Sequence, residues 1–265
     1  MGFIVKVTRA SMRARSLVCV GLDTDTAKLP AGLSGSEGVL AFNHEIIRAT
    51  SDLVCAYKPN SAFYEALGSG GMDALITTCR AIPSGIPIIL DVKRGDIGST
   101  AAKYAEAAYD LFGADAVTVN PYMGFDAVKP FLRPGKCVFV LCLTSNPSSG
   151  DFQFLDTGGA PLYERVARAA MEWAGEGEIG LVVGATQHEA LRRIREIVGD
   201  MPLLIPGIGA QGGDLGLVLH GAGAAPGRTI VNSSREILYA SAGKDYAEAA
   251  RRRLLTLRDE MKRHL

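Results

Sequence analysis

Residues 87–100 read PIILDVKRGDIGST, and this stretch contains the pattern from which the fold is predicted. A short, continuously apolar run is followed at once by the charged residues Asp91, Lys93 and Arg94. Such a run is typical of a parallel β-strand that is buried on both faces of its sheet. Seven further runs of this kind recur along the chain, over residues 17–23, 53–59, 116–121, 137–143, 179–185, 202–208 and 229–234. The sequence therefore predicts eight buried parallel strands.

Amphipathic segments of helical length separate these runs. They cover residues 38–51, 61–81, 100–112, 125–132, 161–174, 188–198, 214–220 and 244–264. Strands that alternate with helices are typical of βα units joined by right-handed crossovers. Eight such units, with no linker or low-complexity segment between them, predict a single-domain (β/α)8 TIM barrel over residues 1–265. A doubly wound open sheet is the alternative, but its first strand is followed by a GxGxxG motif that this chain lacks there.

Composition and charge exclude several classes of protein. The 28 Lys and Arg residues balance the 28 Asp and Glu residues, and without a basic tract the chain lacks the footprint of a nucleic-acid-binding protein. No apolar run reaches the roughly 18 residues that span a bilayer, so we predict no membrane association. Five cysteines without a CxxC pair are typical of reduced, buried thiols, which predicts a cytoplasmic location. The four scattered histidines have no metal-binding spacing, so we predict no metal site.

The N-terminal residues 1–16 mix four basic side chains with apolar ones at helical spacing. A secretory signal peptide would instead contain an uninterrupted apolar stretch. We therefore predict a helix that caps the start of the fold. An arginine-rich organelle presequence is the alternative, because no acidic residue precedes Asp23.

Polar residues follow the apolar runs, at the end of a barrel where catalytic groups project. The candidates are Asp23, Lys58, Asp91, Lys93, Asn120, Thr144, Ser145, Gln211 and Arg235. Asp91 and Lys93 are two positions apart and point to the same side of a strand, while Lys58 ends the neighbouring strand. We expect a Lys–Asp–Lys cluster in which the ammonium groups keep the carboxylate ionised. A purely structural group of ion pairs at the rim of the barrel is an alternative interpretation.

The segments after the seventh and eighth runs predict a phosphate site. Residues 206–214 read PGIGAQGGD and residues 232–235 read NSSR. Loops in these two positions recurrently bind phosphate in barrels, through glycine amides and a helix N-terminus. Arg235 can offer a guanidinium fork and Gln211 an amide donor. The longest irregular segment, residues 144–160, follows the fifth run and is expected at the same end of the barrel.

The motif DxKxxDIxxT at residues 91–100 resembles the signature of the orotidine 5′-monophosphate decarboxylase family. The similarity extends in register over nearly the whole chain. It includes VGLD at residues 20–23, YKPN at 57–60, NPY at 120–122, TSNP at 144–147 and PGIGAQGGD at 206–214. YKPN, TSNP and the long fifth loop resemble the bacterial subgroup with the longer chain.

The resemblance implies conversion of orotidine monophosphate to uridine monophosphate in pyrimidine biosynthesis, by a homodimer that needs no metal or organic cofactor. It implies that Lys58, Asp91 and Lys93 act within one subunit. Asp96 of each subunit would reach into the other subunit's site, with Ile97 and Thr100 beside it.

The same resemblance implies a set of substrate contacts. Asp23 and Lys58 would meet the ribose hydroxyl groups, Ser145 the edge of the pyrimidine, and Gln211 and Arg235 the phosphate. The remaining positions expected to bind substrate are Asn120, Thr144, Gly209, Gly212 and Ser234.

The chemistry of this reaction fits the residues. Loss of CO₂ leaves a carbanion at C6 of the pyrimidine with no electron sink, so stabilisation has to be electrostatic. Lys93 would place a cation beside C6 and then donate the proton that replaces the carboxylate, with Asp91 near the departing group. Two alternatives remain: a metal-dependent sugar-phosphate enzyme on the same barrel, and a non-catalytic barrel that binds a phosphate ligand. The ammonium group of Lys58 opposes the first, because the metal-dependent relatives need a carboxylate there and an ammonium repels Mg²⁺.

Overall fold

The computed structural model describes residues 1–175, 177–208 and 213–264. Within them the chain forms a barrel of eight strands in the order β2-β1-β8-β7-β6-β5-β4-β3, and each strand in this order pairs in parallel with the next. The strands are β1 (Val18–Gly21), β2 (Ala56–Lys58), β3 (Ile89–Arg94), β4 (Ala116–Val119), β5 (Cys137–Leu143), β6 (Glu178–Val183), β7 (Leu203–Pro206) and β8 (Thr229–Ser233). Two single bridges, Tyr57 to Ile88 and Asn60 to Asp91, join β2 to the β3 segment. The predicted (β/α)8 barrel is confirmed.

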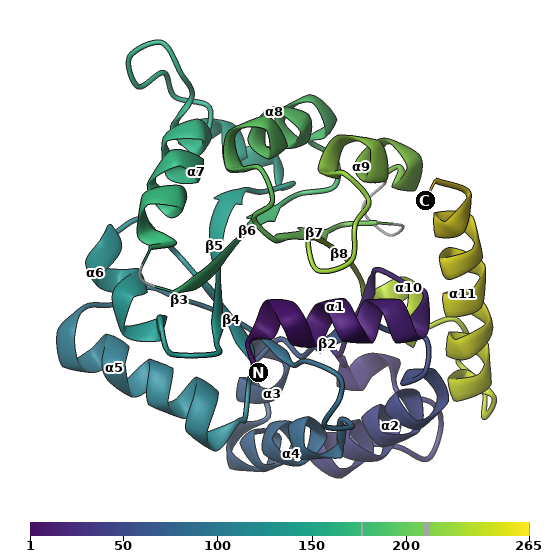
Figure 1. Ribbon diagram of the computed structural model, residues 1–265. Helices are drawn as coiled ribbons and strands as arrows, with labels where there is room; N and C mark the ends of the chain where they lie inside the picture. Colours follow the sequence, from purple (N-terminus) through teal and green to yellow (C-terminus); the bar gives the residue numbers. More distant parts are fainter. Residues whose placement is uncertain (176, 209–212, 265) are drawn as a thin grey trace.

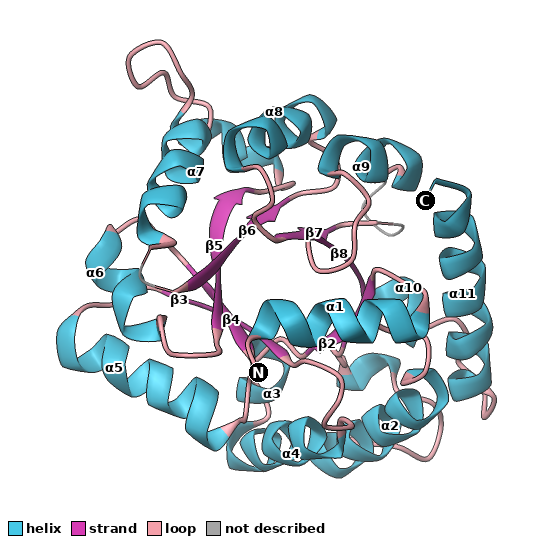
Figure 2. Ribbon diagram, in the orientation of Figure 1, coloured by secondary structure: helices cyan, strands magenta, loops and turns pink. Residues whose placement is uncertain are grey.

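The α-helices surround the barrel, as Figures 1 and 2 show, except for α1, which crosses one of its ends. In the described residues they are α1 (Phe3–Ala14), α2 (Gly35–Thr50), α3 (Ala62–Glu65), α4 (Gly68–Ala81), α5 (Gly98–Glu106), α6 (Phe125–Val128), α7 (Leu162–Trp173), α8 (His188–Val198), α9 (Leu215–Ala222), α10 (Arg235–Leu238) and α11 (Tyr246–Met261). The single helix expected over residues 61–81 is in fact two, α3 and α4. The chain breaks there because Gly68 adopts a φ of +67°, which lies outside the helical region.

Helix α1 packs its apolar face into the barrel at the amino ends of the strands. Phe3 and Val7 are fully buried there, and the ring of Phe3 meets that of Phe139 edge-on at 5.6 Å. The buried residues Cys19, Cys55 and Cys137 belong to this cluster, and all five cysteines of the chain are free. Burial raises the pKa of Cys55 to about 12, so this thiol stays protonated and unreactive near neutral pH. This layer closes one end of the barrel and leaves the carboxyl ends of the strands for the site.

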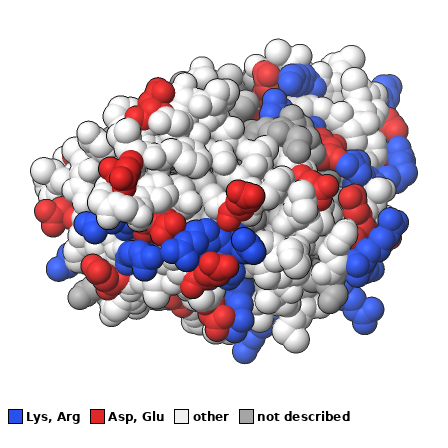
Figure 3. Space-filling view, turned by 90° about the horizontal axis from the view of Figure 1, so that it is seen from above, with Lys and Arg blue, Asp and Glu red and all other residues white. Residues whose placement is uncertain are grey.

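Basic and acidic side chains are interspersed on the face shown in Figure 3. Ion pairs also join α7 to α8: Arg193 lies 3.1 Å from Glu164, and Arg168 of α7 lies 3.5 Å from the same carboxylate. None of the described helices has both the length and the apolar character needed to cross a bilayer.

Candidate active site

A cavity of about 320 Å³ opens at the carboxyl ends of the strands. One part of its wall is polar and charged, and its apolar part comes mainly from β5, β6 and β7. The lining residues are Asp23, Lys58, Asn60, Asp91, Lys93, Thr118, Leu141, Leu143, Thr144, Ser145, Asn146, Val182, Leu204, Pro206, Gly207, Ile208, Asn232, Ser234 and Arg235. Active sites of barrels with this topology lie at this end, because the loops that vary most begin there.

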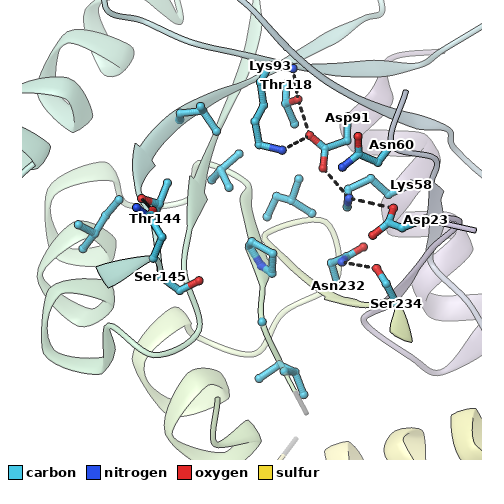
Figure 4. A pocket seen from close by; sticks show the side chains of 18 of the residues that line it. Asp23, Lys58, Asn60, Asp91, Lys93, Thr118, Thr144, Ser145, Asn232 and Ser234 are labelled. Carbon is cyan, nitrogen blue, oxygen red and sulfur yellow. Dashed lines mark hydrogen bonds and ion pairs between the residues drawn. The ribbon is translucent and has the colours of Figure 1, made fainter. Parts of the chain in front are cut away.

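Four charged side chains form a row along one wall of the cavity (Figure 4). Asp91 lies between two lysines, with 2.6 Å from Oδ1 to Nζ of Lys93 and 2.6 Å from Oδ2 to Nζ of Lys58. The Nζ atom of Lys58 lies 4.0 Å from Oδ1 of Asp23. The row therefore alternates in sign, and each interior member has opposite charges on both sides.

Burial and neighbouring charges oppose each other in this row. Burial alone would raise the pKa of Asp91, but the ammonium groups of Lys58 and Lys93 outweigh it and hold that pKa well below its usual range. Burial alone would lower the pKa of Lys58, but the carboxylates of Asp23 and Asp91 outweigh it and raise that pKa. The side chain of Lys93 is about half exposed, at 49%, whereas that of Lys58 is 4% exposed. Lys93 is thus the more accessible of the two ammonium groups that line the cavity.

The predicted Lys–Asp–Lys cluster is present, and three polar residues that were not proposed individually from the sequence lie around it. Asn60 follows β2, Thr118 lies within β4, and Asn232 lies near the end of β8. The signal for Thr118 was a polar side chain inside an apolar run, and Asn232 is the first residue of the NSSR segment that was expected to bind phosphate. Asn60 had no such signal beyond its place in the YKPN motif.

Two buried acceptor oxygens at the cavity have no hydrogen-bond partner among the described residues. They are Oδ1 of Asp23 and Oδ1 of Asn232. The amide nitrogen of Asn232 donates to Oγ of Ser234 at 3.2 Å, which orients the amide. Because unpaired buried acceptors are costly, this corner of the cavity favours a ligand that carries hydroxyl donors.

The residues that follow β5 line the side of the cavity opposite the charged row (Figure 4). The Thr144 backbone N–H donates to Oε1 of Gln153 at 2.8 Å, and the Gln153 amide nitrogen donates back to Oγ1 of Thr144 at 2.8 Å. Ser145 lies next along the chain and lines the cavity. Residues 144–160 therefore fold back on themselves, so that Gln153 holds the start of this loop in place.

The expected phosphate end of the site is only partly described. Ser234 and Arg235 line the cavity, where Arg235 is exposed and begins α10. Gly207 also lines it and has a φ of +107°, a conformation that glycine adopts at little cost. The predicted contacts Gly209, Gln211 and Gly212 lie outside the described residues.

Four of the residues proposed from the sequence do not line this cavity. Asp96 accepts a hydrogen bond from the backbone N–H of Ile97 at 2.8 Å, and Ile97 is 53% exposed. Thr100 is exposed on α5, and the side chain of Asn120 accepts from the backbone N–H of Tyr122 at 3.0 Å. Of these four residues, Ile97, Thr100 and Asn120 are exposed in the single chain and Asp96 is partly buried.

The described residues contain no group of three or more His, Cys, Asp or Glu side chains placed to hold a metal ion. Between the two carboxylates of the row, Asp23 and Asp91, stands the ammonium group of Lys58. A positive charge in that position repels a divalent cation.

Fold and cavity together define the class of this protein: it is a TIM-barrel enzyme whose site combines paired lysines and carboxylates with an arginine at the end of β8. Residues 16–252 match the model of the "Orotidine 5'-phosphate decarboxylase / HUMPS family". The chain belongs to this family.

Curated relatives and solved structures agree with the family. The chain is 50% identical to an orotidine 5′-phosphate decarboxylase of Cupriavidus metallidurans, over 100% of this chain and 99% of the relative. It is 52% identical to the enzyme of the same name from Dechloromonas aromatica, over 98% of each chain. A crystal structure of a putative orotidine-monophosphate-decarboxylase from Toxoplasma gondii is 42% identical, covers 99% of both chains and superposes with a TM-score of 0.88.

Proposed function

We propose that this protein decarboxylates orotidine 5′-monophosphate to uridine 5′-monophosphate in pyrimidine biosynthesis. The row Lys93–Asp91–Lys58–Asp23 in a cavity at the carboxyl ends of the strands carries the proposal. Membership of the family and about 50% identity over the full length to enzymes with this name support it. A site that only binds nucleotides does not need an ammonium group held beside a buried carboxylate.

Lys93 performs the proton transfer in this mechanism. The bond between C6 and the carboxylate carbon breaks, CO₂ leaves, and the electron pair stays on C6. The ammonium group of Lys93 stabilises this negative charge, and because it is already in place it needs no reorganisation during the reaction. One of its protons then bonds to C6, which gives uridine 5′-monophosphate and leaves Lys93 as a neutral amine to be reprotonated from water.

Asp91 and Lys58 hold the side chain of Lys93 in position. Oδ1 of Asp91 accepts from Nζ of Lys93 at 2.6 Å, and Lys58 neutralises the other carboxylate oxygen at 2.6 Å. The carboxylate of Asp91 also lies near the position of the departing substrate carboxylate. The two negative charges repel each other, and this repulsion ends when CO₂ leaves.

The remaining contacts bind parts of the substrate that do not react. Oδ1 of Asp23, which has no hydrogen-bond partner among the described residues, accepts from a ribose hydroxyl group, and Ser145 faces the pyrimidine from the opposite side. Arg235 binds the phosphate with its guanidinium group, together with Gln211. Binding energy from the remote phosphate contributes to lowering the barrier when it organises the reacting groups.

The active form is a homodimer in this proposal. Asp96 of each subunit reaches into the other subunit's site, with Ile97 and Thr100 beside it. The exposure of Ile97, at 53%, supports the proposal because a large apolar side chain next to the catalytic strand gains from being covered. Asp96 of the other subunit then adds a further carboxylate beside Lys93, at the end of the charged row where the reaction takes place.

The test is to follow the loss of orotidine 5′-monophosphate in the purified full-length protein, with and without a chelator. We expect turnover in both samples and no turnover of orotidine, which lacks the phosphate. Binding of uridine 5′-monophosphate without any turnover would show a non-catalytic barrel. Loss of turnover with the chelator would favour the metal-dependent sugar-phosphate alternative.

A further inference from the structure

Strand β3 departs from regular pairing at the point where the catalytic side chains arise. Leu90 pairs with Val117 of β4, but the next pair is Arg94 with Val119. Four steps along β3 therefore match two steps along β4, and residues 91–93 form a bulge. Lys93 lies within this bulge and has a φ of +44°, a backbone conformation that residues other than glycine rarely adopt.

A bulge of this kind leaves backbone donors without a partner on the neighbouring strand, since no carbonyl lies opposite them. The donors here are the N–H groups of Val92 and Lys93. Both donate to Oγ1 of Thr118, each at 3.0 Å. The hydroxyl group of Thr118 donates in turn to Oδ1 of Asp91 at 2.9 Å. A side chain of β4 thus takes the place of the missing backbone acceptors.

The hydrogen-bonding capacity of this hydroxyl group is fully used. A threonine hydroxyl has one proton and two lone pairs, and Thr118 donates once and accepts twice. It is also buried, with 1% of the residue exposed. Because backbone N–H groups occupy both lone pairs of the Thr118 oxygen, the hydroxyl proton of Thr118 can point only toward Asp91.

The bonds around Thr118 close a ring that contains Lys93. The backbone N–H of Lys93 donates to Thr118, and Nζ of the same lysine donates to Oδ1 of Asp91 at 2.6 Å. That oxygen is the one to which Thr118 donates. One hydroxyl group therefore holds both the backbone of the lysine and the acceptor of its ammonium group.

We infer that Thr118 is a positioning residue for the decarboxylation: its hydroxyl group stabilises the bulge that directs Lys93 into the cavity and orients the Asp91 carboxylate between the two lysines. The inference rests on the proposed function in taking Lys93 as the reacting ammonium group. Thr118 acts through its neighbours, because small displacements of a reacting group cost rate even when the ligand still binds.

Thr118→Val tests this inference, because valine keeps the shape and the β-branch and removes only the hydroxyl group. We expect kcat for orotidine 5′-monophosphate to fall roughly 10²-fold. We expect the dissociation constant of uridine 5′-monophosphate to stay the same, since Thr118 supports Lys93 rather than the phosphate or the ribose. Thr118→Ser keeps the hydroxyl group and should restore most of kcat.

A matched control separates positioning from the general cost of losing a buried hydroxyl group. Thr229 is fully buried at the start of β8, and its Oγ1 donates to the carbonyl of Gly223 at 2.6 Å, far from the cavity along the strand. We expect Thr229→Val to lower the melting temperature and to leave kcat unchanged.

The crystal structure of Thr118→Val should show that Lys93 no longer has a positive φ.

Three results would each overturn the inference. The first is a Thr118→Val enzyme with the kcat of the wild type. The second is a Thr118→Val crystal structure in which Lys93 is still at positive φ. The third is a Thr118→Ser enzyme as slow as Thr118→Val, because the hydroxyl group would then not be the cause. Absence of turnover in the wild type would instead refute the proposed function, and the crystal structure of the valine variant would still decide the role of Thr118 in the bulge.

Discussion

Lys58 and Asp91 form an ion pair of 2.6 Å, and their side chains are only 4% and 9% exposed. Removing two charges from water is costly, and an apolar pair of the same size is often as stable. The presence of this buried ion pair is therefore better explained by its role in the site than by a contribution to the free energy of unfolding. It fixes a carboxylate at a defined point, and the second oxygen of that carboxylate holds Lys93.

The Asp91 carboxyl group predicts how stability depends on pH. Because its pKa in the folded protein is lowered, its contribution to the free energy of unfolding is complete above the unfolded pKa of about 3.9 and is lost as the pH falls toward the folded pKa. We expect stability to fall below about pH 4, and to fall less steeply in Asp91→Asn. Urea denaturation at a series of pH values measures this. The control is Asp110→Asn, which removes an exposed ion pair with Arg133. Equal slopes for Asp91→Asn and the wild type would contradict the prediction.

Lys93→Ala should abolish turnover and leave the fold intact. The variant loses both the cation beside C6 and the proton donor, so we expect kcat to fall by more than roughly 10⁴-fold. Circular dichroism and thermal unfolding should resemble those of the wild type, because half of the side chain is already exposed. Lys103→Ala, which removes an exposed lysine paired with Glu106, is the matched control. Ordinary activity of Lys93→Ala would refute the mechanism.

Arg235→Ala should weaken ligands that carry a phosphate and spare those that do not. A hydrogen bond between charged groups contributes about 1.5–3 kcal/mol, so binding of uridine 5′-monophosphate should weaken roughly 10- to 100-fold. Binding of uridine should not change. Calorimetric titration of both ligands measures the difference, and Arg133→Ala controls for loss of a surface arginine. Equal weakening of the two ligands would show that Arg235 does not bind the phosphate.

Mixing two inactive variants tests the proposed dimer. Lys93→Ala and Asp96→Ala each remove one residue from every site. After subunit exchange, half of the dimers are hybrids, and each hybrid contains one intact site if Asp96 serves the other subunit. We therefore expect about a quarter of the wild-type activity to return. Mass spectrometry verifies the exchange, and no recovery after verified exchange would place Asp96 within its own subunit's site.

The sequence predicted the strands well because their signal is local. All eight strands of the described structure fall within or beside the apolar runs, since two-sided burial in a parallel sheet demands continuous apolar residues. Helices were predicted less well. The segment 61–81 splits at Gly68, whose backbone conformation is not visible in an amphipathic pattern.

The charged part of the site followed from the same reasoning. Strand ends of a barrel converge, so Lys58, Asp91 and Lys93 could be brought together from their positions alone, and the structure joins them at 2.6 Å. Thr118 could not be placed in this way. Its partners, Val92 and Lys93, lie 26 and 25 residues away, and they meet it only because the β3 register slips.

By itself, then, the sequence determined the order of strands and helices and the chemical types at the strand ends, because periodicity and polarity are properties of neighbouring residues. Only the tertiary structure decided which way these groups point. The bulge in β3, the positive φ of Lys93 and the bonding of Thr118 arise from pairing between strands, and such pairing depends on the packing of the whole barrel.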